Sequence, residues 1–228
     1  MNELPWSYIL LEQLTGYCHD TVTLRKWVTA AFPDKPLLHQ HEPGSGKPIY
    51  QYPLVQYKII ERVPIIFGIG DGSEQVCEIC SHIQNKITRL GPIIVRDVTL
   101  RVGLAQLLES EPKRYRFISP WLAFNKKNYR IYRAAEGWAE RKRLINSVLI
   151  GNVLSMAKAL SIIVDFTIRT KTKVDMMTLQ ISRHGLVGHG FLGVFETNLD
   201  LPPLLGLGRH VSLGYGTVIE EGKNNWIS

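Results

Sequence analysis

The sequence predicts an α+β protein made of two tandem ferredoxin-like (RRM-like) βαββαβ domains. In the first half, apolar segments follow the order strand, helix, strand, strand, helix, strand, which is the split βαβ arrangement. The second half repeats part of this order. A chain of 228 residues also has room for two domains of about 110 residues, each with its own core. We place the domains at residues 1–108 and 109–228.

The first domain contains six predicted elements. Apolar residues recur at helical spacing after Asp20, a suitable N-cap, and stop at Pro33. Glu61 and Arg62 separate two β-rich runs and predict a tight turn. We expect strands at residues 6–14, 50–60, 63–70 and 93–102, and helices at residues 21–32 and 71–90.

The second domain follows the same pattern less regularly. We expect one long helical segment at residues 126–160, interrupted at Gly137 and Gly151. Extended segments are expected at residues 114–124, 161–170, 173–181 and 186–197. A helical turn at 201–205 and a closing strand at 215–220 complete the predicted domain.

The charge balance favours an anionic partner. Lysine and arginine outnumber aspartate and glutamate by 27 to 20, giving a formal charge of +7 and a pI near 9.3. Nucleic acid is the first partner this suggests, and an acidic membrane surface the second.

Cys77 and Cys80 form C-x-x-C, but no second pair or histidine cluster completes a zinc site, so we expect buried free thiols. The sequence has no leader pattern and no apolar run of membrane length, so we expect a cytoplasmic protein. We expect no cofactor.

A polar loop after the first predicted helix concentrates side chains suited to acid–base and phosphate chemistry. They are His39, His41, Lys47, Tyr50 and Tyr52. Histidine exchanges protons near neutral pH, lysine stabilises charge on a phosphorane, and tyrosine can donate a hydrogen bond to phosphate. RNA scission without a metal needs such a set, because one group must deprotonate a ribose 2′-hydroxyl and another must protonate the departing 5′-oxygen. Two other interpretations stay open: the histidines as metal ligands beside Glu42, or as ordinary polar loop residues.

A glycine-rich loop near the C-terminus is the second candidate site. Gly206, Gly208, Gly214 and Gly216 have the spacing G-x-G-x5-G-x-G around Arg209 and His210, and a β-branched run follows. Glycine allows positive φ and close approach of another backbone, so the loop suits a phosphate chain. The alternative is a mobile surface loop or a bulged hairpin.

Basic residues on the long predicted helix form a third candidate. Lys126, Arg130, Arg133 and Arg141 fall within a stripe of about 80° at 100° per residue, and Ile131, Trp138 and Ile145 share another face. Arg114 and Arg116 alternate on a predicted strand. These cations can contact RNA phosphates, or they can be a solvated surface.

The order of these motifs resembles a known family. A helix, a histidine-bearing loop and a strand reading Tyr-Gln-Tyr-Pro-Leu-Val-Gln-Tyr-Lys over residues 50–58 resemble the CRISPR-associated endoribonucleases that cut precursor repeat RNA. The C-terminal glycine-rich loop resembles that of the repeat-associated RNA-binding superfamily in CRISPR systems. The resemblance implies a duplicated fold over the whole chain. It also implies a catalytic histidine at His41 or His39, assisted by Tyr50, Tyr52 or Lys47.

The activity that this resemblance implies is cleavage of CRISPR repeat RNA without a metal, giving 5′-hydroxyl and 2′,3′-cyclic phosphate ends. A non-catalytic RNA-binding subunit of the same superfamily is the alternative, and a metal-dependent hydrolase using His39 and His41 is a more distant one. The expected partners are repeat RNA and CRISPR effector subunits. The protein is expected to be a monomer or a homodimer.

Overall fold

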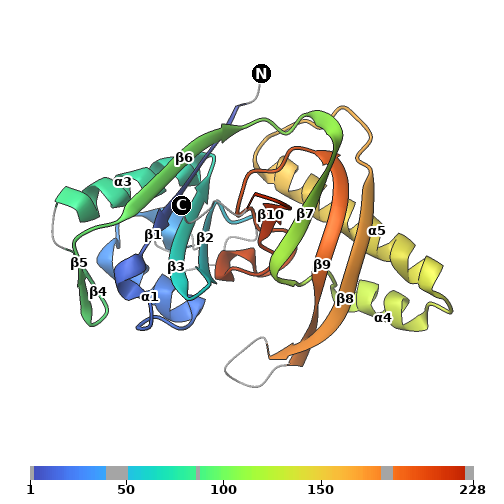
Figure 1. The fold of residues 1–228 in the computed structure, drawn as a ribbon, viewed down its shortest axis with the longest axis horizontal. Helices are drawn as coiled ribbons and strands as arrows, with labels where there is room; N and C mark the ends of the chain where they lie inside the picture. Colours follow the sequence, from blue (N-terminus) through green and yellow to red (C-terminus); the bar gives the residue numbers. More distant parts are fainter. Residues whose placement is uncertain (1–2, 40–50, 86–87, 181–186, 224–228) are drawn as a thin grey trace. The chain divides into compact units, whose positions relative to one another are not determined.

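The computed structural model describes residues 3–39, 51–85, 88–180 and 187–223. The chain forms two compact units (Figure 1). The first contains Met1–Gln106 together with Val211–Gly214, and the second contains Leu107–His210 and Tyr215–Ser228. Four residues of the glycine-rich stretch therefore belong to the first unit, which the sequence did not predict.

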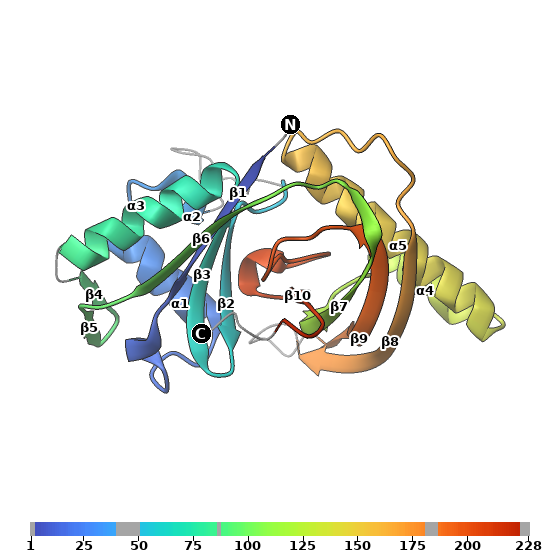
Figure 2. The ribbon, with the colours of Figure 1, turned by 45° about the horizontal axis from the view of Figure 1, so that its top comes forward.

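The first unit is a four-stranded antiparallel sheet with helices on one face. Its strands are β2 (Val55–Ile60), β3 (Val63–Ile69), β1 (Leu4–Leu10) and β6 (Thr99–Ala105), in that spatial order. Helices α1 (Thr21–Ala31) and α3 (Asp71–Asn85) cover the same face, as Figures 1 and 2 both show. Tyr57, Ile66 and Ile9 form one cross-strand row of the core beneath these helices. The element order and the sheet order are those of a ferredoxin-like domain.

Local signals set several boundaries of this unit. Asp20 caps α1, because its carboxylate accepts a hydrogen bond from the Thr23 amide at 2.8 Å. Glu61 and Arg62 have φ of 49° and 69°, as the two central residues of a type I′ hairpin turn require. The predicted cap and the predicted tight turn are confirmed.

Other predicted boundaries in this unit are wrong. The expected strand at 93–102 is two strands, because β5 (Ile93–Val95) pairs with β4 (Thr88–Leu90) and β6 begins only at Thr99. The Gln13 side chain accepts a hydrogen bond from the Arg96 amide between them, where the strand hydrogen-bonding pattern is interrupted. Residues 12–14, expected to continue the first strand, form the helical turn η1 (Glu12–Leu14).

The second unit is also a four-stranded antiparallel sheet. Its strands, in spatial order, are β10 (Val218–Glu220), β7 (Glu109–Trp121), β9 (Val187–Leu199) and β8 (Thr170–Gln180). Helices α4 (Lys126–Ala134) and α5 (Trp138–Ala159) connect β7 to β8. In the described part of the chain between β9 and β10, the only helical segment is the turn η2 (Val211–Leu213). The glycine-rich stretch thus stands where a ferredoxin-like domain has its second helix.

The second unit also corrects two predictions. Residues 161–169 form no strand, and β8 instead begins at Thr170 and pairs with β9 along its whole length. Residues 201–205 form a turn without a helix. The two-domain ferredoxin-like fold itself is confirmed.

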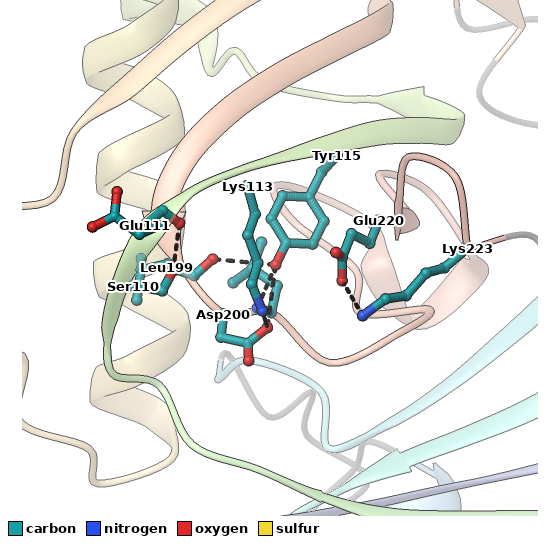
Figure 3. Close-up of polar contacts among 9 residues, drawn as sticks. Ser110, Glu111, Lys113, Tyr115, Leu199, Asp200, Glu220 and Lys223 are labelled. Carbon is teal, nitrogen blue, oxygen red and sulfur yellow. Dashed lines mark hydrogen bonds and ion pairs between the residues drawn. The ribbon is translucent and has the colours of Figure 1, made fainter.

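Tyr115 on β7 anchors the chain where it leaves β9 (Figure 3). Its hydroxyl donates to the Leu199 carbonyl at 3.2 Å and accepts from the Leu201 amide at 2.9 Å. Burial, as the largest cause, raises the pKa of this phenol above its ordinary value. Lys113 forms an ion pair of 2.7 Å with Asp200 beside it. These contacts fix the start of the segment that continues into the glycine-rich stretch.

Candidate active site and RNA-binding surface

The first unit holds His39 in place through two backbone contacts. Contrary to the expected loop, residues 36–39 form the short helix α2 (Pro36–His39). The buried Tyr57 hydroxyl on β2 donates to the Leu38 carbonyl at 3.0 Å, and the Arg25 guanidinium on α1 donates to the His39 carbonyl. Burial raises the pKa of Tyr57, so its phenol stays protonated and remains a donor. Tyr57 is thus a packing and positioning residue.

The ring of His39 has a defined hydrogen-bonding direction. Its Nε2 lies 3.3 Å from the Phe32 carbonyl oxygen, which can only accept. Nε2 must therefore carry the hydrogen of this contact. In the neutral ring, Nδ1 then presents a lone pair that can accept a proton.

Tyr52 belongs to a hydrogen-bonded chain with Gln56 and Lys58. Lys58 Nζ donates to Gln56 Oε1 at 2.8 Å, and Gln56 Nε2 reaches both the Pro53 carbonyl at 3.2 Å and the Tyr52 hydroxyl at 2.9 Å. An ammonium only donates and a carbonyl only accepts, so both contacts require the same orientation of the Gln56 amide. Gln56 consequently donates to the Tyr52 oxygen, and the Tyr52 hydrogen is directed elsewhere.

Lys58 is the unusual member of this chain because its side chain is almost fully buried, with 1% exposed. Its Nζ also lies 5.4 Å from the centre of the Phe67 ring. Burial lowers the pKa of Lys58 to about 7. Lys58 and Gln56 were not among the site residues predicted from the sequence. The available signal was two polar residues in the apolar strand Val-Gln-Tyr-Lys-Ile-Ile.

Lys58→Met is expected to remove a pH dependence from the protein's stability. In the folded state Lys58 loses its proton near pH 7, whereas the unfolded chain keeps it up to its ordinary pKa of 10.5. Between these values the unfolded state binds more protons at this residue, so the contribution of Lys58 to wild-type stability rises with pH by about 1.4 kcal/mol per unit. The variant lacks this gain, so its melting temperature relative to wild type should fall from pH 7 to pH 10. The exposed Lys158→Met is the control, and parallel curves for Lys58→Met and wild type would contradict the assignment.

Part of the predicted catalytic loop lies outside the described residues, namely His41, Lys47 and Tyr50. Of the predicted catalytic side chains, the structure thus describes His39 and Tyr52.

In the described ranges, no three histidine, cysteine or acidic side chains are grouped to hold a metal ion. Cys18, Cys77 and Cys80 are free thiols, and burial raises the pKa of Cys80 to about 11. None of the described helices is both long enough and apolar enough to cross a membrane.

Glycine at position 208 is required by packing within the second unit. Gly208 has φ of +94°, and a Cβ there would lie 2.7 Å from Trp121 Nε1. Gly206 forms a bridge with Thr217, and the Leu207 amide donates to the Gly216 carbonyl at 2.9 Å. This part of the glycine-rich stretch is therefore an internal hairpin-like structure.

The tip of the stretch packs inside the first unit, on α1 and β2. Thr21 donates to the Leu213 carbonyl at 3.0 Å, and a Cβ on Gly214 would lie 2.8 Å from the Tyr57 carbonyl. Gly214 has φ of +81°, so both its conformation and this close approach favour glycine. Tyr57 thus contacts α2 through its hydroxyl and Gly214 through its backbone. The tip and the His39-bearing turn meet the same strand.

Arg209 and His210 are the exposed members of the glycine-rich stretch. Arg209 Nη1 donates to the Phe124 carbonyl at 3.1 Å, which orients a guanidinium that has five N–H donors. His210 has φ of 55°. Its ring lies edge-on to the Tyr215 ring, with the two ring centres 6.3 Å apart. Desolvation, and then the nearby Arg209 charge, lower the pKa of His210. Arg209 is the group here that carries a permanent positive charge.

The predicted basic stripe does not lie on one helix. Lys126, Arg130 and Arg133 are exposed on α4, but residues 135–137 break the helix before Arg141 on α5. Arg141 turns back toward the break, where it donates to the Ala135 carbonyl at 3.2 Å and lies 5.4 Å from the Tyr132 ring centre. Ile131 and Trp138 do not share a buried face with Ile145 either, because both are exposed.

Known proteins match both halves of the chain. The family profile of the Cas6b N-terminal domain matches residues 7–93, and that of the Cas6b C-terminal domain matches residues 107–221. Uncharacterized protein MJ0978 of Methanocaldococcus jannaschii is 39% identical over 109 residues, which are 46% of this chain and 71% of that protein.

Solved structures resemble the chain over nearly its full length. A crystal structure of Cas6b covers 96% of this chain and 99% of its own, at 28% identity and a TM-score of 0.83. A crystal structure of the CRISPR RNA processing endoribonuclease Cas6b has the same coverage, at 26% identity and a TM-score of 0.69. Csf5, a CRISPR-Cas type IV Cas6 crRNA endonuclease, shares the fold at 18% identity and a TM-score of 0.60, covering 96% of this chain and 100% of its own.

Proposed function

Because the chain belongs to the Cas6b family, we propose that it is a metal-independent endoribonuclease that binds and cleaves CRISPR repeat RNA. The observation that carries the proposal is the match of both domains to this one family along the chain. The formal charge of +7 supports an RNA partner. In the proposed reaction a ribose 2′-oxygen attacks the adjacent phosphorus and the bond to the 5′-oxygen breaks. The products are a 2′,3′-cyclic phosphate and a 5′-hydroxyl.

We assign proton transfer in this reaction to His39 and His41. His39 acts as the base, since its Nε2 hydrogen is held by the Phe32 carbonyl and Nδ1 presents the lone pair. His41 protonates the departing 5′-oxygen. This division follows general acid–base catalysis, in which one group removes a proton from the nucleophile and another supplies one to the leaving group.

The remaining groups of the proposed site stabilise charge. Tyr52 is assigned to the non-bridging phosphate oxygens, and Gln56 holds the phenol oxygen by a hydrogen bond of 2.9 Å. Lys58 positions Tyr52 by fixing the Gln56 amide. Lys47 and Tyr50 are the further candidates for the phosphorane oxygens.

We assign RNA binding to Arg209 and His210 of the glycine-rich stretch and to cations on the two helices. The helix cations are Lys126, Arg130, Arg133 and Arg141. Gly206, Gly208, Gly214 and Gly216 shape the backbone that presents the first two. CRISPR effector subunits are proposed as further partners, and the protein as a monomer or homodimer.

Arg209→Ala is expected to weaken repeat RNA binding and to flatten its salt dependence. One lost phosphate contact lowers the log–log slope by about one unit. The fold should be unaffected, because the side chain is exposed and makes one hydrogen bond to the Phe124 carbonyl. Salt-dependent affinity and melting temperature are measured together. A normally melting Arg209→Ala protein with wild-type affinity and slope would remove Arg209 from the RNA surface.

Gly208→Val is the contrasting variant for the same stretch. The added side chain meets Trp121 and must adopt a positive φ, so it should destabilise the fold by about 2 kcal/mol or more. Loss of RNA binding in this variant therefore reports on folding and is not evidence of a phosphate contact.

The experiment that tests the proposed function is incubation of purified protein with its repeat RNA, with and without EDTA. Cleavage that resists chelation is the expected result. Binding without cleavage would select the non-catalytic RNA-binding alternative. Cleavage that stops with EDTA would contradict the metal-independent mechanism.

A further inference from the structure

The sheet of the second unit carries an open cavity of about 440 Å³. Its lining includes Arg114, Trp138, Lys142, Lys171, Lys173 and Glu196. This volume lies within the range of sites that hold small organic groups. Apart from Arg114, none of these residues was predicted from the sequence to bind a ligand.

Strand register explains why the cations gather. Arg114, Glu196 and Lys171 are opposite one another on β7, β9 and β8. Lys173 follows two residues later on the same face, whereas Thr172 between the lysines is buried. Residues two apart on a strand are separated by about 7 Å, so successive lysines can meet successive phosphates of an extended chain.

The cavity keeps an excess of positive charge. Arg114 forms an ion pair of 2.7 Å with Glu221, and both side chains stay about half exposed. Lys142, Lys171 and Lys173 form no ion pair with any other residue in the described part of the chain. Glu196 is the acidic side chain in the lining. The cavity therefore favours an anion.

Trp138 adds an exposed aromatic face to this cationic site. It is the first residue of α5, and 67% of it is exposed. Lys142, one turn later, places its Nζ 4.7 Å from the ring centre and covers one face of the indole. The other face is available for a planar group.

We propose that this cavity binds single-stranded RNA, with one base stacked on Trp138 and the adjoining phosphates at Lys142, Lys171 and Lys173. The inference rests on the proposed function only in taking RNA as the polymer. Base stacking on an aromatic side chain and a groove of cations are the two components of single-strand binding. In a duplex the base faces are stacked on one another, so they are not available to stack on Trp138. An acidic protein would contact the lysines but would not require the indole ring.

The site is tested by fluorescence anisotropy of a labelled oligouridylate, with a blunt RNA duplex of equal length for comparison. Trp138→Ala should weaken oligouridylate binding by about 10-fold or more and leave duplex binding nearly unchanged. Trp138→Phe should restore part of the loss. Lys171→Ala with Lys173→Ala should flatten the salt slope by about 1.4, since each single-strand phosphate contributes about 0.7.

Matched controls come from the same unit. Lys158→Ala removes an exposed lysine at the other end of α5, and Ile163→Ala removes an exposed apolar side chain. Both should bind as wild type does. Melting temperatures verify that every variant is folded.

The outcomes separate this site from the proposed function. Folded Trp138→Ala protein that binds oligouridylate with wild-type affinity would overturn the proposal. Equal competition by polyglutamate against oligouridylate in wild type and in Trp138→Ala would also overturn it. That result would indicate an acidic protein as the partner of this cavity. Wild-type protein that binds oligouridylate through Trp138 but cuts no repeat RNA would overturn the proposed cleavage and support this site.

Discussion

A repeat RNA with a single 2′-deoxy nucleotide just 5′ of the scissile phosphate is expected to bind normally and remain uncut. In the proposed reaction the missing hydroxyl is the nucleophile, so the base, His39, has no proton to remove at that position. Phosphate contacts carry most of the affinity, and they are unchanged by the substitution.

The measurement is a single-turnover cleavage assay beside a binding assay. The same substitution one nucleotide further upstream is the control and should be cut at close to the normal rate. Cutting of the first substrate at an undiminished rate would exclude attack by the ribose.

His41→Ala is expected to lower the single-turnover rate by about 10²-fold or more, the usual effect of losing a positioned acid or base. His39→Ala should cost a similar factor, because its ring is held with Nδ1 presented for proton transfer. RNA affinity should change little in either variant, since neither histidine is assigned a phosphate contact.

His19→Ala provides the control, because His19 is an exposed histidine of the same unit. Its cleavage rate should equal that of wild type. Wild-type rates for both His39→Ala and His41→Ala would place the active site elsewhere in the chain.

The fold was predictable because strong local signals agree with it. The Asp20 cap, the helical spacing before Pro33 and the two β-rich runs around Glu61 and Arg62 each specify one element. The break between α4 and α5 was predicted at Gly137, which is the N-cap of α5, whereas the interruption expected at Gly151 is wrong because α5 continues through it. A single glycine lowers helix propensity but does not by itself end a helix.

The candidate site was predictable only in its residue types. Histidines, tyrosines and a lysine close together in sequence are visible without a structure. The hydrogen-bond direction through Gln56 is not, because it depends on the Pro53 carbonyl and the Lys58 ammonium meeting the same amide. Likewise, glycine spacing suggested a ligand-facing loop, whereas Gly208 and Gly214 are constrained by Trp121 and Tyr57.

The cavity beside Trp138 depended on strand register, which the sequence did not provide. Lys171 lies in one cross-strand row with Arg114 because β9 pairs with both β7 and β8. Lys173 follows on the same face of β8. A break between two strands was expected at residues 170–173, so this cross-strand row of charged residues could not be predicted. Trp138 was likewise expected on an apolar helix face with Ile131 and Ile145, although it is exposed.

Metal-independent cleavage by a ribose 2′-hydroxyl leaves product ends that differ from those of hydrolysis by water. Purified protein is incubated with repeat RNA in EDTA, and both fragments are analysed by mass spectrometry. We expect a 5′-hydroxyl on the downstream fragment and a 2′,3′-cyclic phosphate on the upstream one. A 5′-phosphate with a 3′-hydroxyl would exclude attack by the ribose, because those ends require attack by water.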